Sequence, residues 1–192
     1  MPEEAGPRII GLYGDIDDER AADTLNGLIA LHHDRFRFEP VDPDDPDCEE
    51  FREIVLPIEL LISTGGGTLG DMFAIYDTLR VFREECEIRT HGLGRVMSAG
   101  VLLLAAGEKG KRKISKNTRL MIHSVLGGDY MPYPSLKVAI EEAKTLQDMM
   151  FDALAEETNL TVEQLNNMAN NNIDKFFSAE DAVEMGIADI IV

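Results

Sequence analysis

The stretch E-L-L-I-S-T-G-G-G-T-L-G-D-M-F-A-I-Y-D-T-L-R-V-F, residues 59–82, contains the structural unit on which this protein is built. Residues 59–63 are a short apolar run that is typical of a buried strand, and the glycines at 65–67 turn the chain. Apolar residues then recur at helical spacing from Asp71 to Phe82, and Thr68 with Asp71 makes a capping pair at the start. A buried strand that leads through a glycine turn into an amphipathic helix indicates an α/β protein.

The same order of strand, glycines and helix occurs again downstream. Residues 87–90 predict a strand that leads through Gly92 and Gly94 to Ser98, where a helix of small residues and leucines begins, to end at Gly107. Further strands are predicted at 8–13, 111–115, 119–123 and 190–192, and further helices at 17–32, 135–157, from 161 onward and from 178 to 186. Strands that alternate with helices predict an α/β domain with mostly parallel pairing.

Length and charge limit the kind of protein. A chain of 192 residues with 44% hydrophobic residues has enough apolar side chains for one core of ordinary size, so we expect a single domain over residues 1–192. The formal net charge of −18 argues against nucleic acid or an anionic membrane as partner, because such binding needs clustered Lys and Arg. The one basic cluster, residues 109–113, is short and is expected to close a turn.

Cysteine usage and the N-terminal residues bear on the cellular compartment. Cys48 and Cys86 have no metal-ligand spacing and are too few for a disulfide framework, which fits a reducing compartment. Residues 1–6 lack a signal pattern, and no apolar run approaches the ~18 residues that a membrane span requires. We therefore expect a cytoplasmic protein with no membrane segment.

A dense acidic run interrupts the chain at residues 41–50, where prolines alternate with aspartates. Neither a helix nor a central strand tolerates that composition, so we expect a solvated loop. A Ca²⁺ loop is an alternative interpretation of the aspartates. It is disfavoured because the EF-hand spacing, with its central Gly and terminal Glu, is absent.

Three side chains supply the chemistry of a serine hydrolase. Ser98, His123 and Asp174 each lie in an apolar or small-residue context rather than a solvated one. A hydroxyl, an imidazole and a carboxylate are the groups that acyl transfer by a serine nucleophile needs. Each residue also has an ordinary structural interpretation: Ser98 as a helix N-cap, His123 as a core histidine and Asp174 as a loop acid.

Acyl transfer also needs donors that stabilise an oxyanion, and two backbone N–H groups are candidates. Gly67 belongs to the glycine turn at the carboxyl end of a buried strand, where no Cβ blocks the approach of a ligand. Ala99 follows Ser98 and donates from the first turn of a helix, whose dipole also favours negative charge there. We expect the N–H groups of Gly67 and Ala99 to form the oxyanion hole.

Nucleotide binding is a rival interpretation of the glycine turn. Residues 65–70 satisfy the G-x-G-x-x-G pattern between a strand and a helix. However, the next strand leads into residues 90–92, T-H-G, instead of an acid that could hold a ribose, and the helix from Thr68 lacks the Gly-Lys-Ser or Gly-Lys-Thr of a phosphate loop. His32, His33 and His91 have no partners at metal-ligand spacing and are expected on the surface or in loops, so no metal site is expected.

Taken together, these motifs resemble those of the Clp protease proteolytic subunits, a family of serine peptidases. The similarity runs from Arg8 to the C-terminus and rests on five segments in the family's order. They are R-I-I-G-L-Y-G-D-I, I-S-T-G-G-G-T-L-G-D-M-F-A-I-Y-D-T-L, M-S-A-G-V-L-L-L-A-A-G, N-T-R-L-M-I-H-S-V-L-G-G and D-K-F-F-S-A-E-D-A-V-E-M-G-I-A-D.

The resemblance implies roles for single residues. Ser98 would be the nucleophile, His123 the general base and then acid, and Asp174 the group that orients the imidazole. Gly127 and Gly128, in the histidine segment, would bind substrate. The two backbone N–H groups described above would form the oxyanion hole, and no cofactor or metal would be required.

The resemblance also implies a fold and an assembly. The fold would be a crotonase-like ββα spiral with an extended handle helix, the handle region covering residues 129–158. Seven-membered rings would stack face to face into a tetradecamer, and an AAA+ ATPase would feed the enclosed chamber with unfolded protein.

Several departures from the family pattern limit this transfer. The acidic stretch 36–57 looks like an insertion loop before the glycine strand, and the segment before the first strand is shorter than the family's axial loop, which affects ATPase docking. Residues 64–65, Thr-Gly, replace the usual Ser-Pro, and residues 124–125, Ser-Val, replace the usual Gln-Pro. Pro132 and Pro134 fall where the family has an extended strand that binds peptide and pairs the two rings.

Three classes of function follow. The first is a self-compartmentalising serine endopeptidase that cleaves peptides and unfolded proteins through an acyl-enzyme. The second is a catalytically silent or regulatory ring subunit, which the presence of Ser98, His123 and Asp174 disfavours. The third is a crotonase-fold enzyme acting on acyl-CoA, which would use the same backbone N–H groups without a serine nucleophile.

Overall fold

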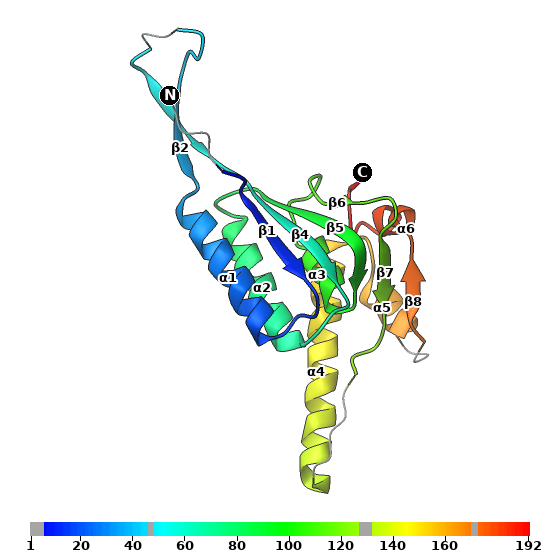
Figure 1. Ribbon diagram of the computed structural model, residues 1–192. Coiled ribbons are helices and arrows are strands. Elements are labelled where there is room, and N and C mark those ends of the chain that lie inside the picture. The colour runs from blue at the N-terminus through cyan, green and yellow to red at the C-terminus, as the bar shows by residue number, and fades with distance from the viewer. Residues whose placement is uncertain (1–5, 46–47, 127–131, 170–172) are drawn as a thin grey trace.

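A computed structural model describes residues 6–45, 48–126, 132–169 and 173–192 (Figure 1). Its central sheet has the strand order β1 (Ile9–Tyr13), β4 (Ile58–Thr64), β5 (Ile88–Met97), β6 (Lys113–Ile114) and β9 (Ile190–Ile191). The strand β7 (Arg119–Ile122) also pairs with β5, and β8 (Lys175–Phe177) pairs with β7. Every pairing in this sheet is parallel except that of β7 with β8. The prediction of an α/β protein with a mainly parallel sheet is confirmed.

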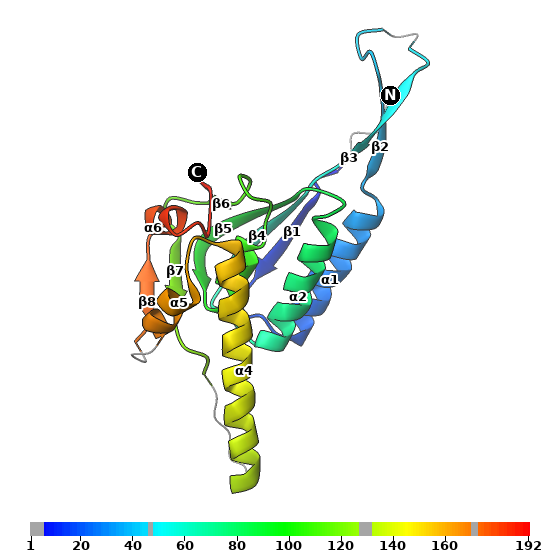
Figure 2. The same ribbon diagram turned by 180° about the vertical axis from the view of Figure 1, so that it is seen from behind.

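Helices follow the strands as the periodicity predicted. They are α1 (Asp18–His33), α2 (Leu69–Phe82), α3 (Ala99–Ala105), α4 (Tyr133–Glu157), α5 (Val162–Ala169) and α6 (Ala179–Glu184). The helices α1 and α2 lie side by side, and α3 lies against α2 and the strands β4 and β5 (Figures 1 and 2). The first turns of α4 extend away from the body, and its buried residues are confined to its last turns. Within the described ranges, no helix combines the length and apolarity that crossing a membrane requires.

The helix α3 lies at the centre of the core. All of its residues are buried, including Leu102, Leu103 and Leu104, which are fully inaccessible to solvent. A helix that is hydrophobic on every side is stable only when it is surrounded by protein. Buried side chains from Leu12 to Ala188 form one hydrophobic cluster around it.

The strand β5 is longer than the sequence predicted, because Gly92 and Gly94 do not end it. Its register with β4 shifts between Ile62 and Thr64, and Gly94 takes a φ of 63° there. A bulge of this kind bends a strand without terminating it, so β5 continues to Met97.

The prediction that His91 lies on the surface or in a loop is wrong. His91 is a half-buried residue within β5, with its Nε2 3.0 Å from Ser115 Oγ. Burial lowers the pKa of His91, which favours the neutral ring.

The acidic stretch 36–57 is a β-hairpin and not, as expected, a loop throughout. The strands β2 (Phe36–Pro40) and β3 (Phe51–Val55) pair antiparallel along their whole length. Phe36 and Phe38 in β2, and Phe51 and Val55 in β3, are aromatic or β-branched residues on one face, a strand signal that the neighbouring acidic run obscured. The hairpin projects from the end of the body opposite to α4 (Figures 1 and 2).

Two further features lie near the candidate catalytic residues. The strand β8 had not been predicted, although Phe176 and Phe177 have high strand propensity. The segment at Pro132 and Pro134 is not an extended strand: Pro132 is the N-cap of α4 and Pro134 lies in its first turn. Proline fits that place because its fixed φ suits a helix start and its missing N–H is not needed there.

The basic cluster at 109–113 closes a turn, as predicted, and contains a buried anchor. Arg112 is 4% exposed and binds Asp189 through two hydrogen bonds, Nε to Oδ2 at 2.8 Å and Nη2 to Oδ1 at 2.6 Å. Its Nη1 also donates to the carbonyl oxygens of Ala105 and Glu157, near the ends of α3 and α4. Arg112 therefore ties the last strand to two helix ends.

Replacing Asp189 by Asn should reduce the free energy of unfolding by about 3 kcal/mol at neutral pH, because it leaves a buried guanidinium without its counter-charge. Burial alone would raise the pKa of Asp189, but the hydrogen bonds from Arg112 hold it below its ordinary value of 3.8. The stabilisation is therefore present above pH 3.8 and is lost as the pH falls through the lower folded-state value. Urea unfolding at several pH values measures this.

The matched control is Asp23→Asn, which removes an exposed ion pair with Arg20. The free energy of unfolding of this variant should fall by less than about 1 kcal/mol. Equal losses for the two variants would contradict the anchoring role of Arg112.

Candidate active site

Ser98 lies at a strained turn between β5 and α3. It has φ 53° and ψ −123°, and among the described residues it alone combines a positive φ with a side chain. Ser98 occupies the N-cap position, but its hydroxyl makes no capping hydrogen bond, and its N–H donates to Met121 O at 2.8 Å. A strained strand-to-helix turn is one way in which proteins present a nucleophilic hydroxyl to a site.

The register of β5 with β7 brings His123 to this hydroxyl. Met97 pairs with Met121 in parallel, so the residues that follow the two strands emerge at the same edge of the sheet. His123, which follows β7, places its Nε2 2.8 Å from Ser98 Oγ. This distance is a good hydrogen bond between an imidazole and a hydroxyl.

The strand β8 brings the third residue. It runs antiparallel to β7 with Ile122 opposite Lys175, so the next positions along the ladder are His123 and Asp174. Asp174 Oδ1 lies 3.7 Å from His123 Nδ1, which is longer than a hydrogen bond. The Asp174 side chain is 54% exposed, against 16% for His123. The structure thus brings the three predicted residues together, with the carboxylate held more loosely than the other two.

The glycine turn packs directly on Ser98. Gly66 has a φ of 103°, and a Cβ placed on it would lie 2.6 Å from Ser98 Cβ. A Cβ on Gly67 would lie 2.0 Å from Ile16 O. Glycine is therefore required at both positions. Hydrogen bonds fix the turn, since Ile16 N–H donates to Gly66 O at 2.8 Å and Gly66 N–H donates to Thr64 Oγ1 at 3.0 Å.

The two expected oxyanion donors belong to segments that adjoin Ser98, because the glycine turn packs on Ser98 and Ala99 follows it in the chain. In the part of the chain that the structure describes, no hydrogen bond engages the Gly67 N–H, and Gly67 lines the pocket in front of Ser98. Ala99 is fully buried and begins α3, where a helix leaves its first N–H groups without intrahelical acceptors. Gly127 and Gly128, the expected substrate-binding residues, lie outside the described residues.

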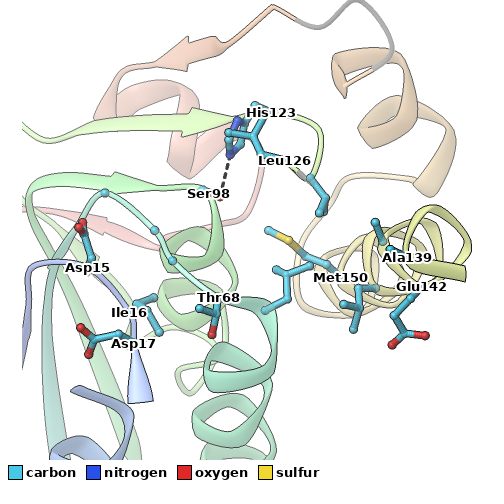
Figure 3. A pocket seen from close by; sticks show the side chains of 17 residues that line it. Asp15, Ile16, Asp17, Thr68, Ser98, His123, Leu126, Ala139, Glu142 and Met150 are labelled. Atoms are coloured by element: carbon cyan, nitrogen blue, oxygen red, sulfur yellow. Dashed lines mark hydrogen bonds between the residues drawn. The ribbon is translucent and has the colours of Figure 1, made fainter. Parts of the chain in front are cut away.

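A cavity of about 870 Å³ opens beside Ser98 and His123, within the size range of ligand pockets. The glycine turn forms one wall and α4 faces it across the cavity (Figure 3). The α4 wall presents apolar side chains one or two turns apart, namely those of Ala139, Ala143, Leu146 and Met150. The sequence predicted these residues only as part of the helix 135–157, with no role in a pocket.

A glutamine on α4 holds the segment after His123. Gln147 Oε1 accepts a hydrogen bond from Val125 N–H at 3.0 Å. The proline that is usual at this position in the resembling family could not donate it. Gln147 could not be predicted from the sequence, because a polar residue on a long helix gives no local signal of a distant backbone partner.

Three carboxylates, those of Asp15, Asp17 and Glu142, also line the cavity, and no Lys or Arg does so among the described residues. Negative charge disfavours phosphate groups, so the pocket argues against the nucleotide interpretation of the glycine turn. The described ranges contain no group of three His, Cys, Asp or Glu side chains placed to hold a metal ion.

A family comparison accounts for this arrangement. The family model described as Clp protease matches residues 52–192, which include Ser98, His123 and Asp174. The chain belongs to the Clp protease family.

Two curated relatives extend the similarity to most of the chain. They are the ATP-dependent Clp protease proteolytic subunit 1 of Corynebacterium glutamicum and that of Corynebacterium diphtheriae. Each is 34% identical over 183 residues, which cover 95% of this chain and 77% of the relative. The match to the Clp protease model starts inside β3, so α1 and β2 lie before it.

Gly66→Ala tests the packing of the glycine turn on Ser98. The added Cβ would lie too close to Ser98 Cβ, and an alanine at this position would have an unfavourable positive φ. Labelling of Ser98 by a fluorophosphonate should therefore slow at least about tenfold. Gly70→Ala is the matched control, since a Cβ there meets nothing within 4 Å. Mass spectrometry measures the labelling rates. Equal rates for the two variants would show that the glycine turn does not position the Ser98 hydroxyl.

Proposed function

We propose that this protein is a serine endopeptidase that cleaves peptides and unfolded proteins through an acyl-enzyme. The observation that carries the proposal is the 2.8 Å contact between Ser98 Oγ and His123 Nε2 at a strained turn, in a chain of the Clp protease family. A hydroxyl that donates to an imidazole beside a glycine-lined pocket is the arrangement that acyl transfer requires.

In the proposed mechanism, Ser98 Oγ attacks the carbonyl carbon of the scissile peptide bond while His123 Nε2 takes its proton. The N–H groups of Gly67 and Ala99 stabilise the oxyanion of the tetrahedral intermediate. His123 then gives the proton to the leaving amine, and the C–N bond breaks to leave an ester on Ser98. Water, deprotonated by His123, hydrolyses that ester and restores both residues.

Asp174 acts as the orienting acid. Its carboxylate faces His123 Nδ1, where it favours the tautomer that leaves Nε2 free to accept the proton of Ser98. Because catalytic hydrogen bonds are often long before substrate binds, we expect the 3.7 Å separation to shorten in the substrate complex.

The wall of α4 contributes to substrate binding. Leu146 and Met150 offer apolar surface to peptide side chains, and Gly127 and Gly128 bind the peptide backbone as the resemblance implies. Residues 1–192 form one peptidase domain with the crotonase-like spiral, and the region 129–158, which includes α4, is its handle.

The proposed assembly is a ring of seven copies, with two rings stacked. The exposed apolar residues Val138 and Ile140, 65% and 61% accessible on the projecting part of α4, fit a helix that another copy covers. The relatives are named as ATP-dependent, which supports an AAA+ ATPase as partner. A cytoplasmic location and the absence of a cofactor complete the proposal.

The main alternative is a catalytically silent ring subunit. The loose contact between Asp174 and His123 is the one observation that favours it. A crotonase-fold acyl-CoA enzyme is disfavoured further, because the carboxylates in the pocket would repel the phosphates of coenzyme A.

Ser98→Ala should abolish hydrolysis of a fluorogenic peptide and labelling by a fluorophosphonate, while native mass spectrometry shows the same assembly. The control is Ser115→Ala, because Ser115 is also hydrogen-bonded to a histidine, His91, and plays no part in the mechanism. Wild-type turnover in pure Ser98→Ala protein would refute the proposal.

Asp174→Asn should lower kcat strongly, by up to ~10⁴-fold, the loss seen in chymotrypsin-type triads when the aspartate is replaced. The assembled mass should not change. The matched control is Asp152→Asn, an exposed acid of α4 outside the pocket lining. A kcat within threefold (on the order of 0.7 kcal/mol) of the wild-type value would place the orienting acid elsewhere.

A further inference from the structure

One face of the β2–β3 hairpin is mostly apolar and exposed to solvent. The register pairs Phe36 with Val55, Phe38 with Glu53 and Pro40 with Phe51, so this face carries three aromatic side chains and one central carboxylate. The exposed fractions are 45% for Phe36, 65% for Phe38 and 59% for Phe51. A row of exposed aromatic residues on a projecting element is typical of an interaction surface.

The hairpin also lacks support from the rest of the chain. Within the described residues, β2 and β3 pair only with each other, as a separate two-stranded sheet. An isolated two-stranded sheet is marginally stable in water and normally needs a further layer. The uncovered aromatic face is where that layer would lie.

Charge narrows the choice of occupant. The segment between the two strands, residues 41–50, has six acidic and no basic residues in its sequence. The hairpin therefore presents an apolar face next to a dense negative charge, and its occupant should present apolar residues next to lysines or arginines.

The opposite edge of the same molecule has that composition. Ile190 and Ile191, on the outer strand β9, are 41% and 38% exposed. Lys113 pairs with Ile190 in the ladder, and the N–H of exposed Lys116 donates to Val192 O. Lys111 is exposed nearby on the same turn of the chain. We call Lys111, Lys113, Lys116, Ile190 and Ile191 the β9-edge patch.

The acids near this patch neutralise only part of its charge. Glu87 lies 3.8 Å from Lys111 and Glu59 lies 3.6 Å from Lys113. Asp189 is bound by buried Arg112. Among the described residues no ion pair engages Lys116, which leaves a positive charge beside the apolar strand.

The two surfaces lie on opposite sides of the sheet. The hairpin joins α1 to β4, next to the outer strand β1, whereas β9 is the outer strand on the other side (Figures 1 and 2). Complementary surfaces at opposite edges produce a head-to-tail contact, which can close into a ring. The paired part of the hairpin is ~17 Å long, which is close to the ~19 Å between the outer strands of the sheet. An arm of that length, projecting from one edge, is long enough to reach a neighbouring subunit.

We propose that the 36–57 hairpin is an arm that docks its aromatic face, with the neighbouring acidic residues Asp42, Asp44, Glu49 and Glu50, on the β9-edge patch of the next copy of this chain. The proposal rests on the self-assembly proposed above but not on the peptidase chemistry. It gives the acidic hairpin the role of holding neighbouring subunits together.

Cross-linking from Cys48 tests the arm directly. Cys48 is a free thiol within the acidic segment 41–50, whereas the other cysteine, Cys86, is buried. A short reagent with a maleimide and an amine-reactive ester, applied to the assembled protein, should join Cys48 to Lys116 or Lys111 of another chain. The product is a covalent dimer on a denaturing gel, and peptide mass spectrometry identifies the linked residues.

The double variant Phe38→Ser with Phe51→Ser should lower the dimer yield at least about tenfold (on the order of 1.4 kcal/mol of docking). The matched control Val81→Ser changes a residue of α2 that is 60% exposed and should leave the yield unchanged. Lys116→Glu should reduce the assembled fraction in native mass spectra, and Glu49→Lys with Glu50→Lys in the same chain should restore it.

The possible results distinguish a failure of the proposed arm contact from a failure of the proposed self-assembly. A ring that forms normally but gives no cross-link, or links Cys48 only to lysines of α4, overturns the arm and leaves the self-assembly intact. A protein that stays monomeric overturns both, whether or not it cleaves peptides. Unchanged cross-linking in the phenylalanine double variant would exclude the aromatic face as the docking surface.

Discussion

The candidate active site depends on the register of three strands. β5 and β7 run in parallel and end together, so Ser98 and His123, which follow them, lie side by side. β8 runs antiparallel to β7, so Asp174, which precedes β8, lies opposite His123. Because a shift of one residue in either ladder turns every side chain to the opposite face, the register alone decides whether the hydroxyl and the imidazole meet. The observed Ser98–His123 distance of 2.8 Å is a consequence of backbone pairing.

The rest of the core maintains that register. α3 is enclosed on all sides, and its first residue follows Ser98, so packing of the helix fixes the strained turn from behind. The glycine turn closes on the same residue from the other side, with no room for a Cβ on Gly66. Strain at Ser98 persists because these neighbours over-determine its backbone. The proposed chemistry therefore uses a strained backbone at Ser98, and the packing of α3 and of the glycine turn stabilises that strained conformation.

Local signals in the sequence predicted most elements and the identity of the candidate residues. The cap at Thr68 is determined by Asp71 three positions later, and it forms as expected. Features that depend on distant pairing were missed: β8 is stabilised by β7 more than fifty residues away, and Gln147 has a meaning only beside Val125. The hairpin was missed because a strongly acidic turn masked two short strands.

A crystal structure of the protein after reaction with a fluorophosphonate tests the central claim most directly, because it traps an analogue of the tetrahedral intermediate on the nucleophile. The account predicts phosphorus on Ser98 Oγ, with its oxygen about 2.7–3.1 Å from the backbone nitrogens of Gly67 and Ala99. It also predicts Asp174 within hydrogen-bonding distance of His123 Nδ1. An adduct whose oxygen points to solvent, with His123 turned away from Ser98 in the assembled protein, would contradict it.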